Sequence, residues 1–207
     1  MAEWELYEPK INDLWCPYWF WEATIPSFIC DQIVDVFTKQ GGEYQEGRIS
    51  DTGEIVDGFR KSDIKFSYES WINCMLYGYV CSANAQNFGY KLSGTDKEGF
   101  QFTRYGVGDY YSLHRDFSIA RNAPSHTRKL SVTVQLSDPN TYEGGDLLMD
   151  MCAYDDDPEH RRKDHKITRG KGSIIVFDSR LPHEVTPVTK GTRYSLVKWV
   201  HGDTALQ

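Results

Sequence analysis

A histidine and an aspartate lie two positions apart in the stretch DYYSLHRDFS, which covers residues 109–118. The stretch has the composition of a β-strand, and residues i and i+2 of a strand point to the same side of the sheet. The imidazole of His114 and the carboxylate of Asp116 could therefore hold one metal ion from one side. A surface turn that carries both residues without binding a metal is the alternative, because a single short motif is not specific.

A second histidine and an arginine follow further along the chain. His183 lies in LPHEVTPV, an expected strand, and Arg193 follows a turn expected at residues 190–191. Two histidines and one carboxylate on one face of a metal leave three octahedral positions open, which is the facial triad of non-haem iron(II) oxygenases. This ligand set suits iron(II), although manganese, cobalt or nickel could also occupy it.

Arg193 is expected on a strand beside that of His183, because a tight hairpin would join the two. A guanidinium there could form two parallel hydrogen bonds with a carboxylate inside the fold. The hydroxyl of Ser195, two residues on, would face the same interior. Because an unpaired charge inside a protein is destabilising, a buried anionic ligand is expected beside Arg193.

The chain that carries these residues is 207 residues long, with 40% hydrophobic residues and a formal net charge of −7. Its length predicts one domain, residues 1–207, that can form a core without a structural metal or disulfides. The acidic balance argues against a nucleic-acid partner, whose backbone requires clustered Lys and Arg. No run approaches the roughly 18 apolar residues of a membrane span, so no membrane partner is expected.

The N-terminus and the cysteines predict the compartment. The first residues, MAEWELYEPKIND, are acidic and lack the apolar core of a secretory signal. The cysteines show no CxxC spacing, so they are expected to be reduced thiols and not zinc ligands. They are Cys16, Cys30, Cys74, Cys81 and Cys152. A cytoplasmic protein, in a bacterial cell or a virus-infected host cell, is therefore expected.

The first part of the chain predicts a strand at residues 18–25 and two helices. The first helix begins at Ser27 and ends at Gly41 and Gly42. Its expected apolar side is Phe28, Ile29, Ile33, Val36 and Phe37. The second helix lies within residues 68–89, and its expected packed side is Trp71, Ile72, Met75, Leu76, Tyr79, Val80 and Ala83. Residues 43–63 are polar and Gly-rich, which predicts short strands or a mobile loop that could cover a substrate.

From residue 88 onward, short β-type runs alternate with turn residues. The runs are FGYKLSG, FQFTRYG, DYYSLHRD, RKLSVTVQLSD, GGDLLMD, GSIIVFDS, LPHEVTPV and RYSLVKWVHGD. Their number fits a double-stranded β-helix, or jelly-roll barrel, so the predicted fold is mainly β with N-terminal helices on the outer face of one sheet. Residues 1–98 would support a catalytic core at about residues 99–201. The charged insert at residues 153–166 is expected to be a solvated loop, with His160 and His165 as loop residues.

The segments RYGVGDYYSLHRD, VTVQLSDPNTYEGGDLLM and PHEVTPVTKGTRYSLVKW resemble the catalytic domain of the prolyl-4-hydroxylase-like 2-oxoglutarate/iron(II) dioxygenases. Within that family the chain is most similar to small bacterial and phage members, including the PKHD-type hydroxylases, from about residue 100 to residue 199. The resemblance implies that His114, Asp116 and His183 hold iron(II). It also implies that Arg193, with Ser195 nearby, binds the distal carboxylate of 2-oxoglutarate, and that O2 is the second co-substrate.

Four more positions match residues that have roles in the family. Tyr105 matches a tyrosine that lines the co-substrate pocket. Gln135 stands where some relatives have a tyrosine that contacts the co-substrate, which is a departure from their pattern. Tyr111 matches a tyrosine near the substrate mouth, and Trp199 matches a residue that packs under the iron site. Both are therefore candidate substrate residues.

The reaction implied by the resemblance is hydroxylation of a C–H bond, coupled to conversion of 2-oxoglutarate and O2 to succinate and carbon dioxide. Halogenating relatives have a small residue in place of the carboxylate ligand, so the presence of Asp116 predicts hydroxylation. Gly144 and Gly145 are expected to make a bend at the start of a strand. Asp146 is expected to have a structural role and not a catalytic one.

The expected substrate is a prolyl residue of a peptide or protein, lying across the open mouth beside Tyr111. The alternative among enzymes is hydroxylation of a free amino acid or another small molecule. A nucleic-acid demethylase is not favoured, because those relatives carry a second arginine where this chain has Lys198. The distant alternative is a non-catalytic jelly roll, such as a sugar-binding or virion-surface module, which would need neither the metal ligands nor Arg193.

Overall fold

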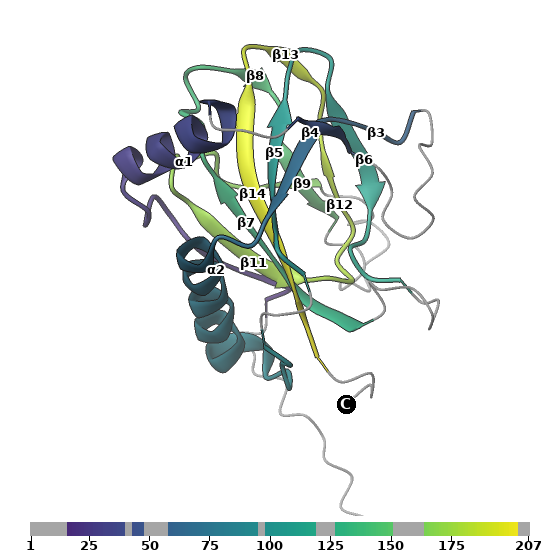
Figure 1. Cartoon of the computed structure of the whole chain (residues 1–207). Helices are drawn as coiled ribbons and strands as arrows, with labels where there is room; N and C mark the ends of the chain where they lie inside the picture. The colour runs from purple at the N-terminus through teal and green to yellow at the C-terminus, as the bar shows by residue number, and fades with distance from the viewer. Residues whose placement is uncertain are drawn as a thin grey trace, which may run out of the picture.

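The computed structural model has two helices ahead of most of its strands, in the predicted order (Figure 1). It describes residues 16–39, 43–47, 58–94, 98–118, 127–150 and 164–202. The helices are α1 (Ser27–Lys39) and α2 (Ser70–Ala83), and α2 continues into a π-helical turn, Asn84–Phe88. The strands are β1 (Tyr18–Trp21), β2 (Gln45–Glu46), β3 (Arg60–Lys61), β4 (Asp63–Ser67), β5 (Phe100–Tyr105), β6 (Tyr110–His114), β7 (Arg128–Gln135), β8 (Glu143–Gly144), β9 (Leu147–Asp150), β10 (Asp164–Lys166), β11 (Ile174–Asp178), β12 (His183–Val185), β13 (Val188–Lys190) and β14 (Arg193–His201).

Most of these strands belong to two sheets that face each other. The larger sheet has seven strands in the order β1-β11-β7-β14-β5-β4-β2, and the smaller has five in the order β10-β9-β12-β6-β3. One apolar cluster contains Tyr105 and Phe177 from the larger sheet and Met149 and Val185 from the smaller, so the sheets form a sandwich. The predicted mainly β, jelly-roll class is confirmed, as an open sandwich and not a closed barrel.

Strand β7 explains how the larger sheet packs on both faces. Successive side chains of a strand point to opposite faces. Leu130, Val132 and Val134 lie in the apolar cluster that includes both helices. Ser131 and Thr133, which are also buried, point to the opposite face, toward the smaller sheet. The apolar face therefore binds the helices, and the polar face lines the space in which a site can form.

Both helices cover the outer face of the larger sheet, as predicted (Figure 1). In α1, Cys30 and Ile33 are buried, and Phe37 stacks on Phe102 with ring centroids 5.0 Å apart. The buried residues of α2 are Ile72, Leu76, Val80 and Ala83. The predicted packed sides were too wide, because a helix on a sheet buries only one stripe of its surface. Phe28, Val36 and Trp71 are 63%, 42% and 49% exposed, respectively.

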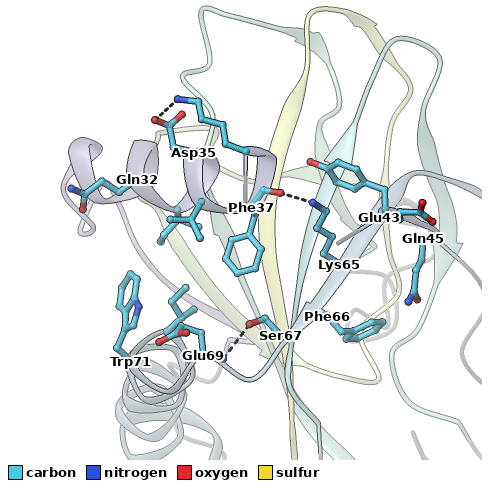
Figure 2. A pocket seen from close by; sticks show the side chains of 15 residues that line it. Gln32, Asp35, Phe37, Glu43, Gln45, Lys65, Phe66, Ser67, Glu69 and Trp71 are labelled. Carbon is cyan, nitrogen blue, oxygen red and sulfur yellow. Dashed lines mark hydrogen bonds and ion pairs between the residues drawn. The ribbon is translucent and has the colours of Figure 1, made fainter. Parts of the chain in front are cut away.

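A wide groove separates α1 from strand β4 and the start of α2 (Figure 2). Lys65 of β4 spans part of it and donates a hydrogen bond to the carbonyl of Phe37, over 2.8 Å. This bond satisfies a carbonyl in the last turn of α1, where intrahelical partners run out. None of the residues predicted to form the site lines the groove.

Several predicted segments differ from the structure. The first strand ends at Trp21 and not at residue 25, because Ala23 adopts φ +46° in a turn. The run FGYKLSG forms only an isolated bridge, between Leu92 and Gly202. His165 lies on β10 and not in a loop. Residues 43–63 contain the short strands β2 and β3, as one alternative predicted.

Some predictions fall outside the described residues. They concern the end of the first helix at Gly41 and Gly42, the loop at residues 48–57, Cys152 and His160. The described cysteines are Cys16, Cys30, Cys74 and Cys81, and they are free thiols, as predicted. In the part of the chain that the structure describes, no helix is long and apolar enough to cross a membrane.

Candidate active site

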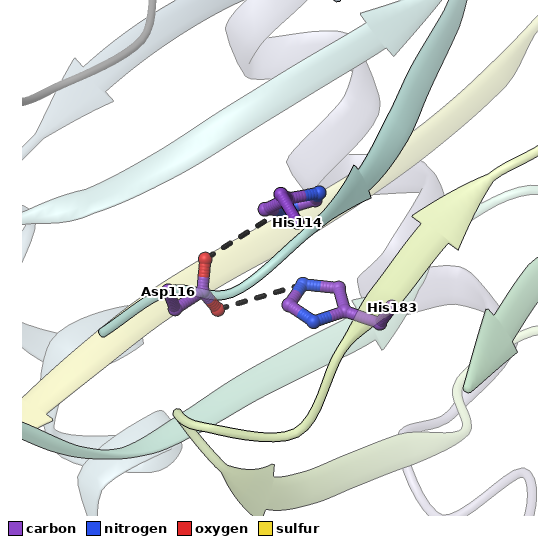
Figure 3. Close-up of side chains that lie close together, drawn as sticks. All are labelled: His114, Asp116 and His183. Atoms are coloured by element: carbon purple, nitrogen blue, oxygen red, sulfur yellow. Dashed lines mark ion pairs between the residues drawn. The ribbon is translucent and has the colours of Figure 1, made fainter. Parts of the chain in front are cut away.

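His114 ends β6 and His183 begins β12, and the two are direct cross-strand partners in the smaller sheet. The carboxylate of Asp116 faces both rings (Figure 3). Its Oδ1 is 3.8 Å from the Nε2 of His114, and its Oδ2 is 3.6 Å from the Nε2 of His183. Among the described residues, this is the only group of three His, Cys, Asp or Glu side chains placed to hold a metal ion, with ligand atoms within 4.8 Å of one another.

Asp116 does not lie on the strand of His114, contrary to the prediction. β6 ends at His114, and Asp116 lies in a bend. Its N–H donates to the carbonyl of Ser179 over 3.0 Å, the Ser131 hydroxyl donates to its carboxylate over 2.6 Å, and Arg128 donates to its carbonyl over 3.3 Å. Burial opposes ionisation, but the two histidines, Arg128 and Ser131 outweigh burial and lower the pKa of Asp116. Distant parts of the chain therefore hold the carboxylate, charged, beside the histidines.

Both histidines have an Nδ1 that donates to a backbone carbonyl and an Nε2 that faces the carboxylate. The Nδ1 of His114 is 2.8 Å from the carbonyl of Ser112, and the Nδ1 of His183 is 2.9 Å from the carbonyl of Leu181. Because a carbonyl only accepts hydrogen bonds, each Nδ1 donates, and a neutral ring then has its lone pair at Nε2. Burial and the neighbouring His183 lower the pKa of His114 to about 3, so this ring is neutral near pH 7.

Arg193, at the start of β14, lines the same pocket as the three ligands from the opposite sheet. It is 2% exposed, and its guanidinium donates to the Oε1 of Gln135 over 2.9 Å and to the hydroxyl of Ser195 over 3.4 Å. The register of the larger sheet brings these residues together, since Arg193 pairs with Tyr105 and Ser195 with Gln135. The buried Nε of Arg193 has no hydrogen-bond partner among the described residues. A buried, incompletely paired guanidinium is what an anion-binding site requires.

The strand of Arg193 is not the neighbour of the strand of His183, so the hairpin prediction was wrong. β12 pairs with β6 and β9, whereas β14 pairs with β5 and β7. Between them, β13 pairs with β8, and the turn that follows uses Gly191 at φ +73°. The chain therefore crosses from the smaller sheet to the larger one before Arg193, which faces His114, Asp116 and His183 across the sandwich.

Three aromatic residues predicted to belong to the site also line the pocket, which has about 470 Å³ of empty space including its open mouth. The ring of Tyr111 stacks on that of His114 with centroids 3.5 Å apart, and burial raises the pKa of Tyr111 to about 12. Its hydroxyl therefore stays protonated near pH 7. The guanidinium of Arg193 lies 5.3 Å from the ring centroid of Tyr105. The buried Nε1 of Trp199 has no hydrogen-bond partner among the described residues.

Arg60 lines the pocket from β3 and was not predicted. An arginine in the polar stretch 43–63 gives no signal in the sequence, and only the pairing of β3 with β6, Arg60 opposite Tyr111, brings it to the site. Asp146 lies 2.9 Å from the Nζ of Lys166 and 3.2 Å from Arg169, and it does not line the pocket. These ion pairs fit the structural role expected of Asp146.

The comparisons with known proteins agree with this geometry. The family model described as the 2OG-Fe(II) oxygenase superfamily matches residues 100–201. A PKHD-type hydroxylase of Klebsiella pneumoniae is 32% identical over 182 residues, which cover 85% of this chain and 76% of that protein. The chain belongs to the 2OG-Fe(II) oxygenase superfamily. A PKHD-type hydroxylase of Pseudoalteromonas atlantica is 35% identical over 103 residues, which cover 48% of this chain and 41% of that protein.

Solved structures of other oxygenases share the fold. A prolyl-4-hydroxylase of Pseudomonas putida superposes with a TM-score of 0.64 and 18% identity, covering 90% of this chain and 93% of that one. A prolyl hydroxylase of Trichoplax adhaerens, in complex with a peptide fragment of hypoxia-inducible factor, has a TM-score of 0.67 and 19% identity, covering 89% and 83%. These similarities confirm the jelly-roll fold of this oxygenase.

Enzymes of this superfamily use iron(II), 2-oxoglutarate and O2. The side chains of this oxygenase fit iron(II) and 2-oxoglutarate. Two imidazoles and one carboxylate form the ligand set that suits iron(II), and their oriented Nε2 and carboxylate oxygens point toward one another. The incompletely paired guanidinium of Arg193 offers a planar donor group to a carboxylate of 2-oxoglutarate.

Proposed function

We propose that this oxygenase hydroxylates a C–H bond, with iron(II) held by His114, Asp116 and His183 and with 2-oxoglutarate anchored by Arg193. The observation that carries the proposal is that these four side chains line one pocket from the two facing sheets. When bound, iron(II) and 2-oxoglutarate supply the oxidising power, through consumption of O2 and release of succinate and carbon dioxide.

The residues of the chain orient these groups and exclude water. The Nδ1 hydrogen bonds of the histidines fix their rings, and Ser131 fixes the carboxylate of Asp116. Such supporting bonds make the ligands rigid before the metal binds. Gln135 and Ser195 orient the guanidinium of Arg193, and Tyr105 covers it from one side. The carboxylate of Asp116 would fill the coordination position that a halide takes in halogenating relatives, which favours hydroxylation.

The substrate proposed for the pocket is a prolyl residue of a peptide or protein. The names of the Pseudomonas and Trichoplax enzymes support this choice, as does Trp199, whose ring lines the pocket and can pack on a pyrrolidine ring. Tyr111 also lines the pocket, but His114 and Arg60 cover the two faces of its ring. A free amino acid or another small molecule is the alternative. Both can be tested by incubating the protein with iron(II), 2-oxoglutarate, O2 and each candidate, and measuring by mass spectrometry whether one oxygen atom is added.

Metal binding can be tested without turnover. Addition of iron(II) and 2-oxoglutarate under nitrogen is expected to produce the weak visible absorption band of a 2-oxoglutarate chelate in the wild-type protein. His183→Ala removes one of the three ligands and is expected to abolish this band. His165→Ala is the control, because this histidine is exposed on β10 and bonds to the hydroxyl of Tyr18. A normal band in His183→Ala would overturn the assignment of the metal site.

A further inference from the structure

Arg60 is a second buried arginine in the pocket, in addition to Arg193. It is 8% exposed, lies on β3 and lines the same pocket as the metal ligands. Its Nε donates to the hydroxyl of Ser62 over 2.8 Å, and its guanidinium carbon lies 4.4 Å from the ring centroid of Tyr111. These contacts fix the plane of the guanidinium but provide no negative charge.

The carboxylates nearest to Arg60 along β3, β4 and the start of β6 are already paired with other cations. Asp63 pairs with Arg104, and Asp109 lies 3.2 Å from the Nζ of Lys61. In the part of the chain that the structure describes, no carboxylate forms an ion pair with Arg60. A buried charge without a partner is costly, so the guanidinium of Arg60 is available to an anionic ligand.

The position of Arg60 is preorganised. The ring of Tyr111 lies between its guanidinium and the ring of His114, whose centroid is 3.5 Å from that of Tyr111. On another side, the backbone of Gly47 approaches so closely that a Cβ added there would lie 2.6 Å from the Nε of Arg60. A side chain at position 47 would displace Arg60 or Ser62, so Gly47 lets the guanidinium keep its place, and a guanidinium held in place loses little entropy when it binds a ligand. Only the ring of Tyr111 therefore separates the guanidinium of Arg60 from the ring of His114. A small substrate bound beside the metal could reach Arg60.

With iron(II) and 2-oxoglutarate bound, the pocket would contain more positive than negative charge. The two positive charges of iron(II) and the charges of Arg60 and Arg193 would face the carboxylate of Asp116 and the two carboxylates of 2-oxoglutarate. Arg128 does not change this balance, because Glu98 pairs with it at 2.7 Å. One positive charge remains, and a single carboxylate on the substrate would neutralise it.

We propose that Arg60 is a specificity-determining residue that binds a carboxylate of the substrate. This inference rests on the proposed function, and it narrows the substrate to a molecule with a carboxylate close to the carbon that is hydroxylated. The carboxylate comes either from the α-carboxyl group of a free amino acid or from an acidic side chain next to the reacting residue of a peptide. A planar guanidinium binds both through two parallel hydrogen bonds.

The experiment compares pairs of probes that differ only in this carboxylate. L-Proline is compared with L-prolinamide, and an end-capped Gly-Pro-Asp-Gly peptide with its Gly-Pro-Asn-Gly counterpart. Calorimetric titration under nitrogen, with iron(II) and 2-oxoglutarate present, measures binding without turnover. The wild-type protein is expected to bind the acid of one pair at least about tenfold more tightly than the amide, and the pair that shows the preference identifies the source of the carboxylate.

Variants then assign the preference to Arg60. Arg60→Gln is expected to abolish it, and Arg60→Lys to retain a part, because an ammonium keeps the charge but lacks the planar fork. Lys61→Gln is the matched control, since this neighbouring lysine is 61% exposed and pairs with Asp109; its preference is expected to equal that of the wild type. Thermal melting followed by circular dichroism establishes that each variant is folded.

Two results would overturn the assignment of Arg60: equal binding of acid and amide in both pairs by the wild type, or an undiminished preference in folded Arg60→Gln. The wild-type comparison decides the question even if the variants do not fold. Failure of the proposed function has a different signature. It would appear as a wild-type protein that forms no succinate from 2-oxoglutarate under air, with or without the probes, and it would remove the basis for the role of Arg60 as well.

Discussion

Substitution of Arg193 tests 2-oxoglutarate binding separately from metal binding. It is 2% exposed, and its buried Nε has no hydrogen-bond partner among the described residues. A hydrogen bond between charged groups contributes about 1.5–3 kcal/mol, and about 1.4 kcal/mol corresponds to a tenfold change in affinity. Arg193→Ala is therefore expected to raise the 2-oxoglutarate concentration needed for half-maximal succinate formation by about tenfold or more, as measured in steady-state assays.

Two further variants make this result specific. Arg193→Lys is expected to recover only part of the affinity, because an ammonium cannot form two parallel hydrogen bonds with a carboxylate. Arg104→Ala removes an arginine from the neighbouring strand β5 that pairs with Asp63, and it should leave the 2-oxoglutarate requirement unchanged. If Arg193→Ala had the same requirement as the wild type, another residue would have to bind the distal carboxylate.

Single residues of the site could be predicted from the sequence to different degrees. His114, Asp116 and His183 could be found because metal ligands are limited to a few residue types and occur here in a characteristic order. Arg60 could not be found, because its burial depends on the backbone of Gly47 and on the ring of Tyr111, which are distant from it in sequence. From the sequence alone, a polar residue that faces a pocket cannot be distinguished from one that faces solvent, because the partner strand is unknown.

At the scale of elements, the alternation of polar and apolar residues predicted most strands but not which strands are neighbours. Strands β12 and β14 lie close in sequence but belong to different sheets. Between them, β13 pairs with β8 in a separate two-stranded sheet. Asp116 was placed on a strand because His–x–Asp matches strand spacing. Instead, a hydrogen bond from the Ser131 hydroxyl and one from the Asp116 N–H to the carbonyl of Ser179 hold it in a bend. Such long-range pairing is not encoded in a local pattern, which explains both errors.

The crossing from β8 to β9 depends on Gly144, and this dependence can be measured. Gly144 adopts φ +69°, and a Cβ there would lie 2.1 Å from the carbonyl oxygen of Pro187. Both the left-handed conformation and the contact with backbone penalise a side chain. Gly144→Ala is expected to lower the free energy of unfolding by about 2–4 kcal/mol in urea titrations, with a lower midpoint.

A second glycine provides the control for this prediction. Gly78 is an exposed residue within α2, and a Cβ added there would have no atom within 4 Å. Gly78→Ala is therefore expected to raise the free energy of unfolding by roughly 0.5–1 kcal/mol, because alanine is the better helix former. Equal effects of the two substitutions would mean that the bend at Gly144 is not strained by a side chain.

At the scale of the whole molecule, one carboxylate links three central strands of the larger sheet. Glu98 precedes β5 and accepts hydrogen bonds from Arg128, at the start of β7, over 2.7 and 3.0 Å. His201, at the end of β14, lies 3.2 Å from the same carboxylate. Arg128 also donates to the carbonyl of Asp116. The network that joins the strands therefore also supports Asp116, so the stability of the sheet and the proposed metal site share one set of contacts.

This network predicts how stability depends on pH. Burial raises the pKa of Glu98, but the neighbouring His201 and the hydrogen bonds from Arg128 outweigh burial and lower the pKa to about 2 from an ordinary value of 4.5. Because the pKa is lower in the folded state than in the unfolded chain, the carboxylate stabilises the fold above about pH 4.5, and this contribution is lost as the pH falls toward 2. Glu98→Gln is expected to reduce the free energy of unfolding by about 3 kcal/mol near pH 7.

The pH profile of Glu98→Gln distinguishes this electrostatic contribution from a defect in packing. Urea titrations of the wild type and the variant are expected to converge as the pH is lowered from about 5 toward 3, because the carboxylate of the unfolded wild-type chain is then increasingly protonated, which favours the unfolded state. Glu46→Gln, at an exposed position of β2, should instead follow the wild type at every pH. A constant difference between wild type and Glu98→Gln across this range would contradict the prediction, because a packing defect does not depend on the protonation of the carboxylate.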